Sequence, residues 1–320
     1  MSDSLATLSY AASPFDHPQA DIILRSSDNI DFRVFRLFLS LASPVFETMF
    51  GLPQPSEGAD PDEETKDGLP VVSVSEGSKT LDALLRFCYP STLAEDPSLD
   101  GFMFATEILE ASKKYSLDAI ERIVCKALFV PKILEVDSLA CFVVARRADL
   151  HEQCALAAKY SLREPLIPAR FEGIQFISST DLLALLTYHK NCANAVLALQ
   201  SNKVWIENHY RQFTAIGWML GCGSCGRPRS SKYSLFGNHN LVASWWEDFM
   251  NETFLEIRDR PCAQTIAKGA EETIRKFRAQ SSCSRCSSAV SGGMQEFVTL
   301  FTNQMEEVTA EVSPVPFASC

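Results

Sequence analysis

The sequence predicts an α+β fold, with a mixed N-terminal α/β domain, an all-helical extension and a small helical C-terminal domain. Three observations lead to this prediction. A strand hairpin runs straight into two short helices within residues 21–50, helical periodicity prevails from residue 137 onward, and two Cys-x-x-Cys pairs flank an aromatic segment after residue 217. We therefore divide the chain into a flexible arm (1–17), a first domain (18–130), a helical extension (131–216) and a C-terminal helical domain (217–320).

The hairpin and the two helices after it organise the first domain. Turn formers at residues 26–29 separate two short apolar runs, which predicts two paired strands. The residues that define these strands are Ile22, Ile23 and Leu24 in the first and Phe32, Val34 and Phe35 in the second. From Arg36 the apolar spacing becomes helical, and Pro44 after Ser43 predicts that a second helix starts there.

The rest of the first domain contains one polar loop and three further helices. Residues 53–68 hold three prolines and six acidic residues, so we expect a solvated loop. A strand follows near residues 71–74, and helices are expected at 81–88, 100–117 and 118–130. Asp118 is expected to cap the last helix. The residues expected on its buried face are Ile120, Ile123, Val124, Ala127 and Leu128.

These residues resemble a BTB/POZ domain over about residues 18–128. The resemblance rests on D-I-I-L, on F-x-V-x-R-x-x-L-x-x-x-S-P-x-F-x-x-M-F, on the run 84–90 and on the run 112–117; Phe35 departs from it, because many members carry His there. The longer layout is similar to BTB proteins of the fungal type. The resemblance implies a non-catalytic interaction module that binds itself, a protein partner such as a cullin ubiquitin ligase scaffold, or a transcriptional complex. Its interaction surface would include Leu37, Phe38, Leu41, Phe46, Met49 and Phe50.

Composition argues against a nucleic acid or an anionic membrane as the main partner. Those partners need concentrated Lys and Arg, whereas this chain carries 29 such residues against 40 Asp and Glu, for a net charge of −11. No secretory signal is evident and no apolar run is long enough to span a bilayer, so we expect an intracellular protein of the cytoplasm or nucleus. Eleven cysteines, an odd number, do not suit a disulfide framework there.

The second half reads as helices. We expect them at residues 138–148, 152–161, 179–200 and 202–213, stacked as a spacer. Near the C-terminus, apolar residues repeat at intervals of four and three, which predicts either an intramolecular core helix or a site for a partner helix. These residues are Met294, Val298, Phe301, Met305 and Val308.

The run GCGSCG at residues 221–226 permits three interpretations. A dinucleotide-binding loop needs a helix directly after the glycines, and the polar residues 227–233 with Pro228 do not supply one. A thioredoxin-like redox pair, Cys222 and Cys225, lacks the same helix. The third is a structural zinc site that joins this pair to Cys283 and Cys286.

We favour structural zinc bound by Cys222, Cys225, Cys283 and Cys286, since small residues surround both pairs and permit tight turns. Buried structural thiols, or a site that includes Cys262 or His239, remain alternatives. The aromatic segment around Trp245 and Trp246 is expected to form the core of this domain, with an aromatic ligand pocket as the alternative.

No catalytic constellation is evident, since the five histidines share no spacing with carboxylate, Ser or Cys that suggests a triad. The sequence therefore predicts a non-enzymatic protein-interaction adaptor. Two alternatives stay open: a thiol redox enzyme using Cys222 and Cys225, and a zinc-dependent nucleic-acid-binding regulator whose basic residues are Arg227, Arg229 and Lys232.

Overall fold

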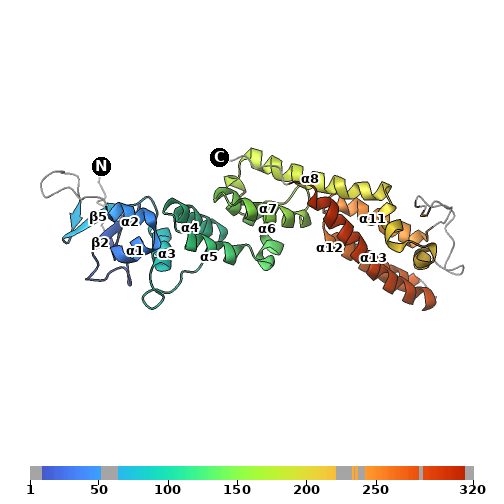
Figure 1. The fold of residues 1–320 in the computed structure, drawn as a ribbon, viewed down its shortest axis with the longest axis horizontal. Coiled ribbons are helices and arrows are strands. Elements are labelled where there is room, and N and C mark those ends of the chain that lie inside the picture. Colours follow the sequence, from blue (N-terminus) through green and yellow to red (C-terminus); the bar gives the residue numbers. More distant parts are fainter. Residues whose placement is uncertain are drawn as a thin grey trace, which may run out of the picture. The chain divides into compact units, whose positions relative to one another are not determined.

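The structure is a computed structural model that describes residues 9–51, 64–220, 233, 235, 236, 242–280 and 284–313; side chains are not described at 213, 214, 280 and 284–286. The chain divides into two compact units. Unit 1 comprises residues 1–134 and 140–153, and unit 2 comprises residues 135–139 and 154–320 (Figure 1). An α+β first unit followed by a mostly helical region confirms the coarser part of the predicted fold class, whereas a zinc-stapled C-terminal domain stays a prediction.

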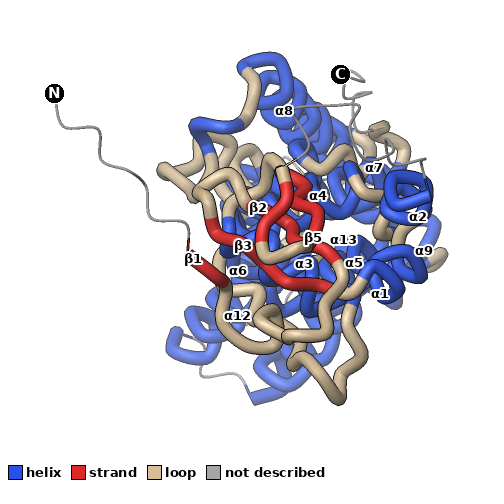
Figure 2. The backbone as a smooth tube through the Cα atoms, turned by 90° about the vertical axis from the view of Figure 1, so that its left-hand side faces the viewer, coloured by secondary structure: helices blue, strands red, loops and turns tan. Residues whose placement is uncertain are grey.

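Unit 1 contains a five-stranded sheet with the order β1-β3-β2-β5-β4, drawn in red in Figure 2. The strands are β1 (Ser9–Tyr10), β2 (Ile22–Arg25), β3 (Ile30–Val34), β4 (Thr65–Lys66) and β5 (Leu69–Ser73). The central strand β2 pairs antiparallel with β3 and parallel with β5. All four residues of β2 are buried, which explains why its apolar run shows no alternation.

The predicted hairpin is confirmed at residues 22–34. Asn29 occupies the turn with φ of 63°, a left-handed conformation that Asn tolerates better than most residues. The Ser26 hydroxyl accepts a hydrogen bond from the Ile30 backbone N–H at 3.0 Å, so the turn is closed by its own side chain. The register pairs Ile22 with Val34 and Arg25 with Asp31.

The part of the N-terminal arm that the structure describes is ordered against the sheet, which corrects the predicted flexible arm for residues 9–17. β1 pairs parallel with β3, with Tyr10 opposite Asp31. Phe15 is fully buried, and its ring lies 5.7 Å from Phe32 and 5.2 Å from Tyr89 between centroids. A two-residue strand and one buried ring carry no periodicity, so the pattern alone did not reveal them.

Five helices complete most of unit 1: α1 (Arg36–Ala42), α2 (Pro44–Gly51), α3 (Ser78–Cys88), α4 (Phe102–Lys114) and α5 (Asp118–Leu128). Two details of α5 were predicted wrongly. Asp118 lies inside the first turn, and Leu117 holds the cap position without a side-chain hydrogen bond. The buried face consists of Ile120, Val124 and Leu128 at intervals of four, while Ile123 is 47% exposed.

Two helices carry the chain from unit 1 into unit 2. They are α6 (Pro131–Arg147), which is kinked at Asp137, and α7 (His151–Tyr160). The short helix η1 (Ser161–Arg163) follows α7, and η2 (Ile174–Phe176) precedes the long helix α8 (Ser179–Ser201). The Ser178 hydroxyl accepts a hydrogen bond from the Asp181 N–H, so α8 begins with a side-chain cap.

The remaining helices pack with α8 to form unit 2 (Figure 1). They are α9 (Val204–Tyr210), η3 (Phe213–Ile216), α10 (Gly217–Leu220), α11 (Ser244–Ile257), α12 (Ala263–Gln280) and α13 (Ser284–Ala310). Residues from α8 and α9 share one core with residues from α11 to α13, so this core extends across the boundary that we expected near residue 216.

The C-terminal seam lies in this intramolecular core, as predicted. Met294, Phe301 and Met305 are buried, and Val298 and Val308 pack against the same core. The sequence pattern missed Phe297, which is fully buried between the predicted positions. No helix in the described part of the chain is long and apolar enough to cross a membrane.

Candidate protein-interaction surface

Three exposed apolar side chains follow one another along α1 and α2. Leu37 is 63% exposed, Leu41 is 77% exposed and Val45 is 37% exposed. They are four residues apart in the sequence, two on α1 and one on α2, and we call them the α1–α2 row. Leu39 on α1 is fully buried, so the helix has one face in the core and one face covered with unpartnered apolar surface.

The predicted interaction residues divide between this surface and the core. Leu37 and Leu41 lie in the row, whereas Phe38, Met49 and Phe50 are half-buried and Phe46 is buried. Val45 was not predicted. It lies on the second helix, beyond the extended Ser43, so no single helical period connects it with Leu37 and Leu41.

Stacked aromatic rings pack the buried face of α2 against the rest of unit 1. Phe46 stacks on Tyr115 with centroids 4.7 Å apart and planes inclined by 12°, and Phe50 stacks on Phe46 at 5.8 Å. Phe38 meets Tyr89 edge-on at 4.9 Å. In these three ring pairs Phe38 and Phe46 face other aromatic rings of unit 1, so they support the α1–α2 row from inside and are not part of its exposed surface.

Directional hydrogen bonds fix where α1 and α2 begin. The Asp21 carboxylate accepts a hydrogen bond from the Arg36 N–H at 2.8 Å, at the first residue of α1. The Ser43 hydroxyl accepts from the Phe46 N–H at 3.1 Å and donates to the Tyr115 carbonyl at 2.5 Å, so it caps α2 and ties it to the end of α4. The α1–α2 row therefore lies on helices whose first residues are fixed by side-chain hydrogen bonds.

A network of charged side chains covers one face of the sheet, and we call it the sheet ion network: Arg25, Asp31, Arg33, Glu64, Lys66 and Asp67. Its centre is Asp31, which is fully buried and accepts from Arg25 Nε at 2.7 Å and from Lys66 Nζ at 2.5 Å. Burial opposes ionisation of Asp31, but the hydrogen bonds from Arg25 and Lys66 outweigh it and hold its pKa below the ordinary value.

The sheet ion network corrects the prediction of a solvated loop at residues 53–68. Residues 52–63 lie outside the described residues, but β4 pairs with β5 and brings Lys66 onto Asp31. Glu64 contacts Arg25 at 2.5 Å, and Asp67 accepts from both Arg33 and the Tyr10 hydroxyl. The end of the acidic stretch is therefore part of the packed domain, and it also holds β1 in place.

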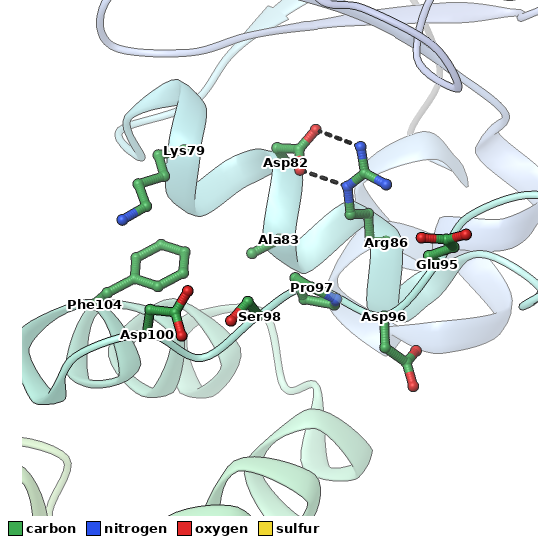
Figure 3. A pocket seen from close by; sticks show the side chains of 10 residues that line it. All are labelled: Lys79, Asp82, Ala83, Arg86, Glu95, Asp96, Pro97, Ser98, Asp100 and Phe104. Atoms are coloured by element: carbon green, nitrogen blue, oxygen red, sulfur yellow. Dashed lines mark hydrogen bonds and ion pairs between the residues drawn. The ribbon is translucent and has the colours of Figure 1, made fainter.

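A pocket of about 350 Å³ lies between α3 and the segment that leads into α4 (Figure 3). Asp82 and Arg86 form an ion pair at 2.6 Å on α3, and Lys79 Nζ lies 4.0 Å from the centroid of the Phe104 ring. Further carboxylates come from Glu95, Asp96 and Asp100. The pocket therefore offers charges of both signs to a ligand.

Cys88 and Cys125 of unit 1 do not suit thiol chemistry. Burial raises the pKa of Cys88 to about 12 and that of Cys125 to about 11, so both thiols stay protonated and unreactive near neutral pH. They behave as small core or surface residues, as expected for most of the eleven cysteines.

The predicted zinc ligands are not tested by the structure. Cys222, Cys225 and Cys283 lie outside the described residues, and Cys286 belongs to α13 but its side chain is not described. Within the described residues, no three His, Cys, Asp or Glu side chains gather in a way that could hold a metal ion.

Comparison with known protein families identifies the first unit. Residues 14–130 match the family model of the BTB/POZ domain, so the chain contains a BTB/POZ domain. Such domains are typically protein–protein interaction modules, sometimes cullin adaptors, and the proteins that contain them are generally non-enzymatic. A search of curated proteins finds no match to the chain.

Proposed function

We propose that this protein is a non-enzymatic adaptor that binds a second copy or a partner protein through the α1–α2 row. The observation that carries the proposal is the exposure of Leu37 and Leu41 on helices whose other faces are fixed in the core. Apolar side chains exposed at 63% and 77% on a rigid support favour association, because burying them removes apolar surface from water without a cost of ordering the helices.

The test replaces Leu37 and Leu41 together by Asp. The matched control is Leu255→Asp, since Leu255 is 61% exposed on α11 of unit 2. Light scattering reports self-association, and affinity capture from native cells with mass spectrometry reports partners. We expect the double variant to lose the association that wild type and Leu255→Asp retain, with an unchanged melting temperature. Equal capture by all three proteins would overturn the proposal.

A cullin scaffold is the more specific partner that we propose, on the ground that some BTB domains serve as cullin adaptors. Co-precipitation of a cullin with wild type, and its loss with Leu37→Asp/Leu41→Asp, is the expected result. If partners are captured but no cullin is among them, the adaptor role stands and the cullin proposal is overturned. A transcriptional scaffold, an intracellular location and the fungal type stay predictions.

We also propose that Cys222, Cys225, Cys283 and Cys286 share one structural zinc ion in unit 2. The support comes from described residues that flank both pairs. Trp218, four residues before Cys222, packs on Trp245 at 6.1 Å between centroids. Phe277, six residues before Cys283, packs on Trp245 at 5.4 Å.

The flank after the second pair leads to the same aromatic cluster. Gly293 lies directly against the Trp218 ring, and Cys286 precedes it on α13 by seven residues, a helical rise of about 10 Å. Cys222 follows the last residue of α10 by two residues, which span at most about 7 Å, so it lies within reach of the start of α13. This convergence favours one shared site over two separate thiol pairs.

Elemental analysis and tryptophan fluorescence during chelation test the zinc proposal. All four tryptophans lie in unit 2, so their emission follows that unit. We expect one zinc per chain and loss of both the metal and the folded emission in Cys283→Ser, with unit 1 intact. Metal-free protein with a folded unit 2 would overturn it. Thiol titration distinguishes the redox alternative, which requires a reactive Cys222 or Cys225 in the absence of chelator.

A further inference from the structure

Unit 2 contains a second pocket, of about 320 Å³, that the adaptor function does not use. Its walls come from three places in the sequence: the end of α7 with η1, the start of α12, and the last turns of α13. The apolar lining residues are Leu156, Tyr160, Leu162, Pro261, Ala263 and Met305. Leu162, Pro261 and Met305 are buried, so the floor is apolar and fixed, while Leu156 is exposed at the edge.

Two cations lie beside this apolar floor. Lys159 and Arg163, four residues apart, both line the pocket. Arg163 lies over the Tyr160 ring at 4.6 Å, and its guanidinium is 3.1 Å from the Glu135 carboxylate, whose side chain is 49% exposed. A guanidinium has five N–H donors, so this half-exposed pair leaves donors for a second acceptor. Lys159 is exposed and forms no ion pair among the described residues.

Two further features bear on the charge of a ligand. α12 begins at Ala263 with no acidic residue in its first turn, so the positive end of an 18-residue helix lies in the pocket wall without compensation. Glu306 also lines the pocket and opposes an anion. Glu135 pairs with Arg163, so Lys159 and the helix N-terminus are the groups that favour a ligand with a single negative charge.

We propose that this pocket binds a small carboxylate with an apolar body. The volume lies at the lower end of the range of about 300–1,000 Å³ that small-molecule sites occupy. The apolar floor would take an aliphatic or aromatic body, and Lys159 with Arg163 would hold the carboxylate at the edge. Inorganic phosphate has no apolar body and would leave the apolar floor unfilled.

Cys262 provides a reporter inside the pocket. Its thiol is half-buried in the lining, 3.4 Å from the Thr265 hydroxyl. In a tethering experiment, the Cys262 thiolate attacks a probe disulfide, forms a mixed disulfide with the probe and releases cysteamine. Excess cysteamine makes the exchange reversible, so the extent of capture reports how well the pocket holds each probe.

Three probes test charge and apolar length on the full-length protein. They are the cysteamine disulfides of 6-mercaptohexanoate, of 6-aminohexanethiol and of 3-mercaptopropionate, with capture at each cysteine measured by peptide mass spectrometry. We expect Cys262 to retain 6-mercaptohexanoate about fivefold or more over the cationic probe, and over the short anionic probe, with the charge preference falling at high salt. Protein unfolded in guanidinium gives the reference ratio.

Lys159→Gln and Arg163→Gln should each reduce the preference for the anionic probe, whereas Lys190→Gln, at an exposed position on α8, should leave it unchanged. Free hexanoate should compete for capture at Cys262 and hexylamine should not. Ratios equal to those of the unfolded protein would overturn the proposal, as would equal capture of the long and short acids. The charge and length ratios need no variant, so they decide the matter even where a variant fails to fold.

Discussion

Unit 1 and unit 2 stabilise their cores in different ways. In unit 1, two buried carboxylates have polar partners: Asp31 binds Arg25 and Lys66, and the Glu76 carboxylate accepts from the Tyr115 hydroxyl at 2.6 Å. In unit 2, the core is a cluster of aromatic rings, and the buried indole N–H of Trp246 has no hydrogen-bond partner among the described residues. Charged hydrogen bonds therefore contribute to the core of unit 1, whereas close packing of aromatic rings dominates the core of unit 2.

This contrast has a physical consequence for what each unit tolerates. A buried ion network depends on every member, because removing one partner leaves the others desolvated and uncompensated. An aromatic core has no such partners to lose, but its close packing resists both cavities and added volume. Unit 1 should therefore be sensitive to acid and to charge removal, and unit 2 to changes of side-chain volume.

The largest expected effect is the loss of Phe297 in unit 2. Its ring lies 5.6 Å from Trp246 and 5.7 Å from Trp205 between centroids, so Phe297→Ala should cost about 3–5 kcal/mol through the cavity it leaves. Tryptophan emission during chemical denaturation measures this, because it follows unit 2 alone. Leu255→Ala, at an exposed position on α11, is the control. A loss as small as that of the control would contradict a close-packed core.

Removing the charge at the centre of the sheet ion network should affect unit 1 nearly as much. Asp31→Asn leaves Arg25 and Lys66 without their buried counter-charge, at a cost of about 3 kcal/mol. Hydrogen-exchange mass spectrometry of β2 and β3 measures the loss. Asp82→Asn removes one partner of a surface pair and should change stability by less than about 1 kcal/mol. Similar values for the two variants would show that the network is solvated.

Asp31 also predicts the direction of the pH response of unit 1. Its pKa is lowered from an ordinary value of 3.8, so the folded state favours the ionised form. The stabilisation is complete above that value and is lost as the pH falls through the lower pKa of the folded state. Protection of β2 and β3 should decrease in this acidic range in wild type, and less so in Asp31→Asn.

Two neighbouring glycines in α13 give the sharpest test of packing in unit 2. A Cβ at Gly293 would lie 2.3 Å from the Trp218 ring, whereas a Cβ at Gly292 would meet no atom within 4 Å. Gly293→Ala should destabilise unit 2 by about 2 kcal/mol through overpacking. Gly292→Ala should stabilise it by about 0.5–1 kcal/mol, because alanine favours the helix. If both substitutions stabilise, the Trp218 ring is not held against α13.

The smallest expected effect concerns the start of α3 in unit 1. The Asp28 carboxylate accepts from the Ser78 N–H at 2.8 Å, and hydrogen bonds from Ser26 and Ser78 lower its pKa to about 2. Asp28→Ala should cost about 1 kcal/mol near neutral pH, as for loss of a helix cap. This difference is present above pH 3.8 and vanishes as the pH falls through about 2. Asp96→Ala, at an exposed carboxylate without a described partner, should have no comparable effect.

Local patterns in the sequence were sufficient for much of the fold. The apolar run at Ile22 to Leu24, the turn before Ile30 and the break at Ser43–Pro44 each act through neighbouring residues, so the hairpin and the two helices of the candidate surface could be predicted. The same holds for the seam that ends at Val308, because its intervals alone place it on one face of a helix.

Only the tertiary structure decided which of these residues face water and which distant charges meet. Leu37 and Phe46 are both large and apolar, so hydropathy does not distinguish which of them faces water. In the structure Phe46 is buried against Tyr115, which lies far along the chain, and Leu37 is exposed. Lys66 and Asp31 are 35 residues apart, and an acidic stretch with no periodicity gives no sign that its end returns to the sheet. Contacts of this kind depend on strand order and loop closure, which no local pattern encodes.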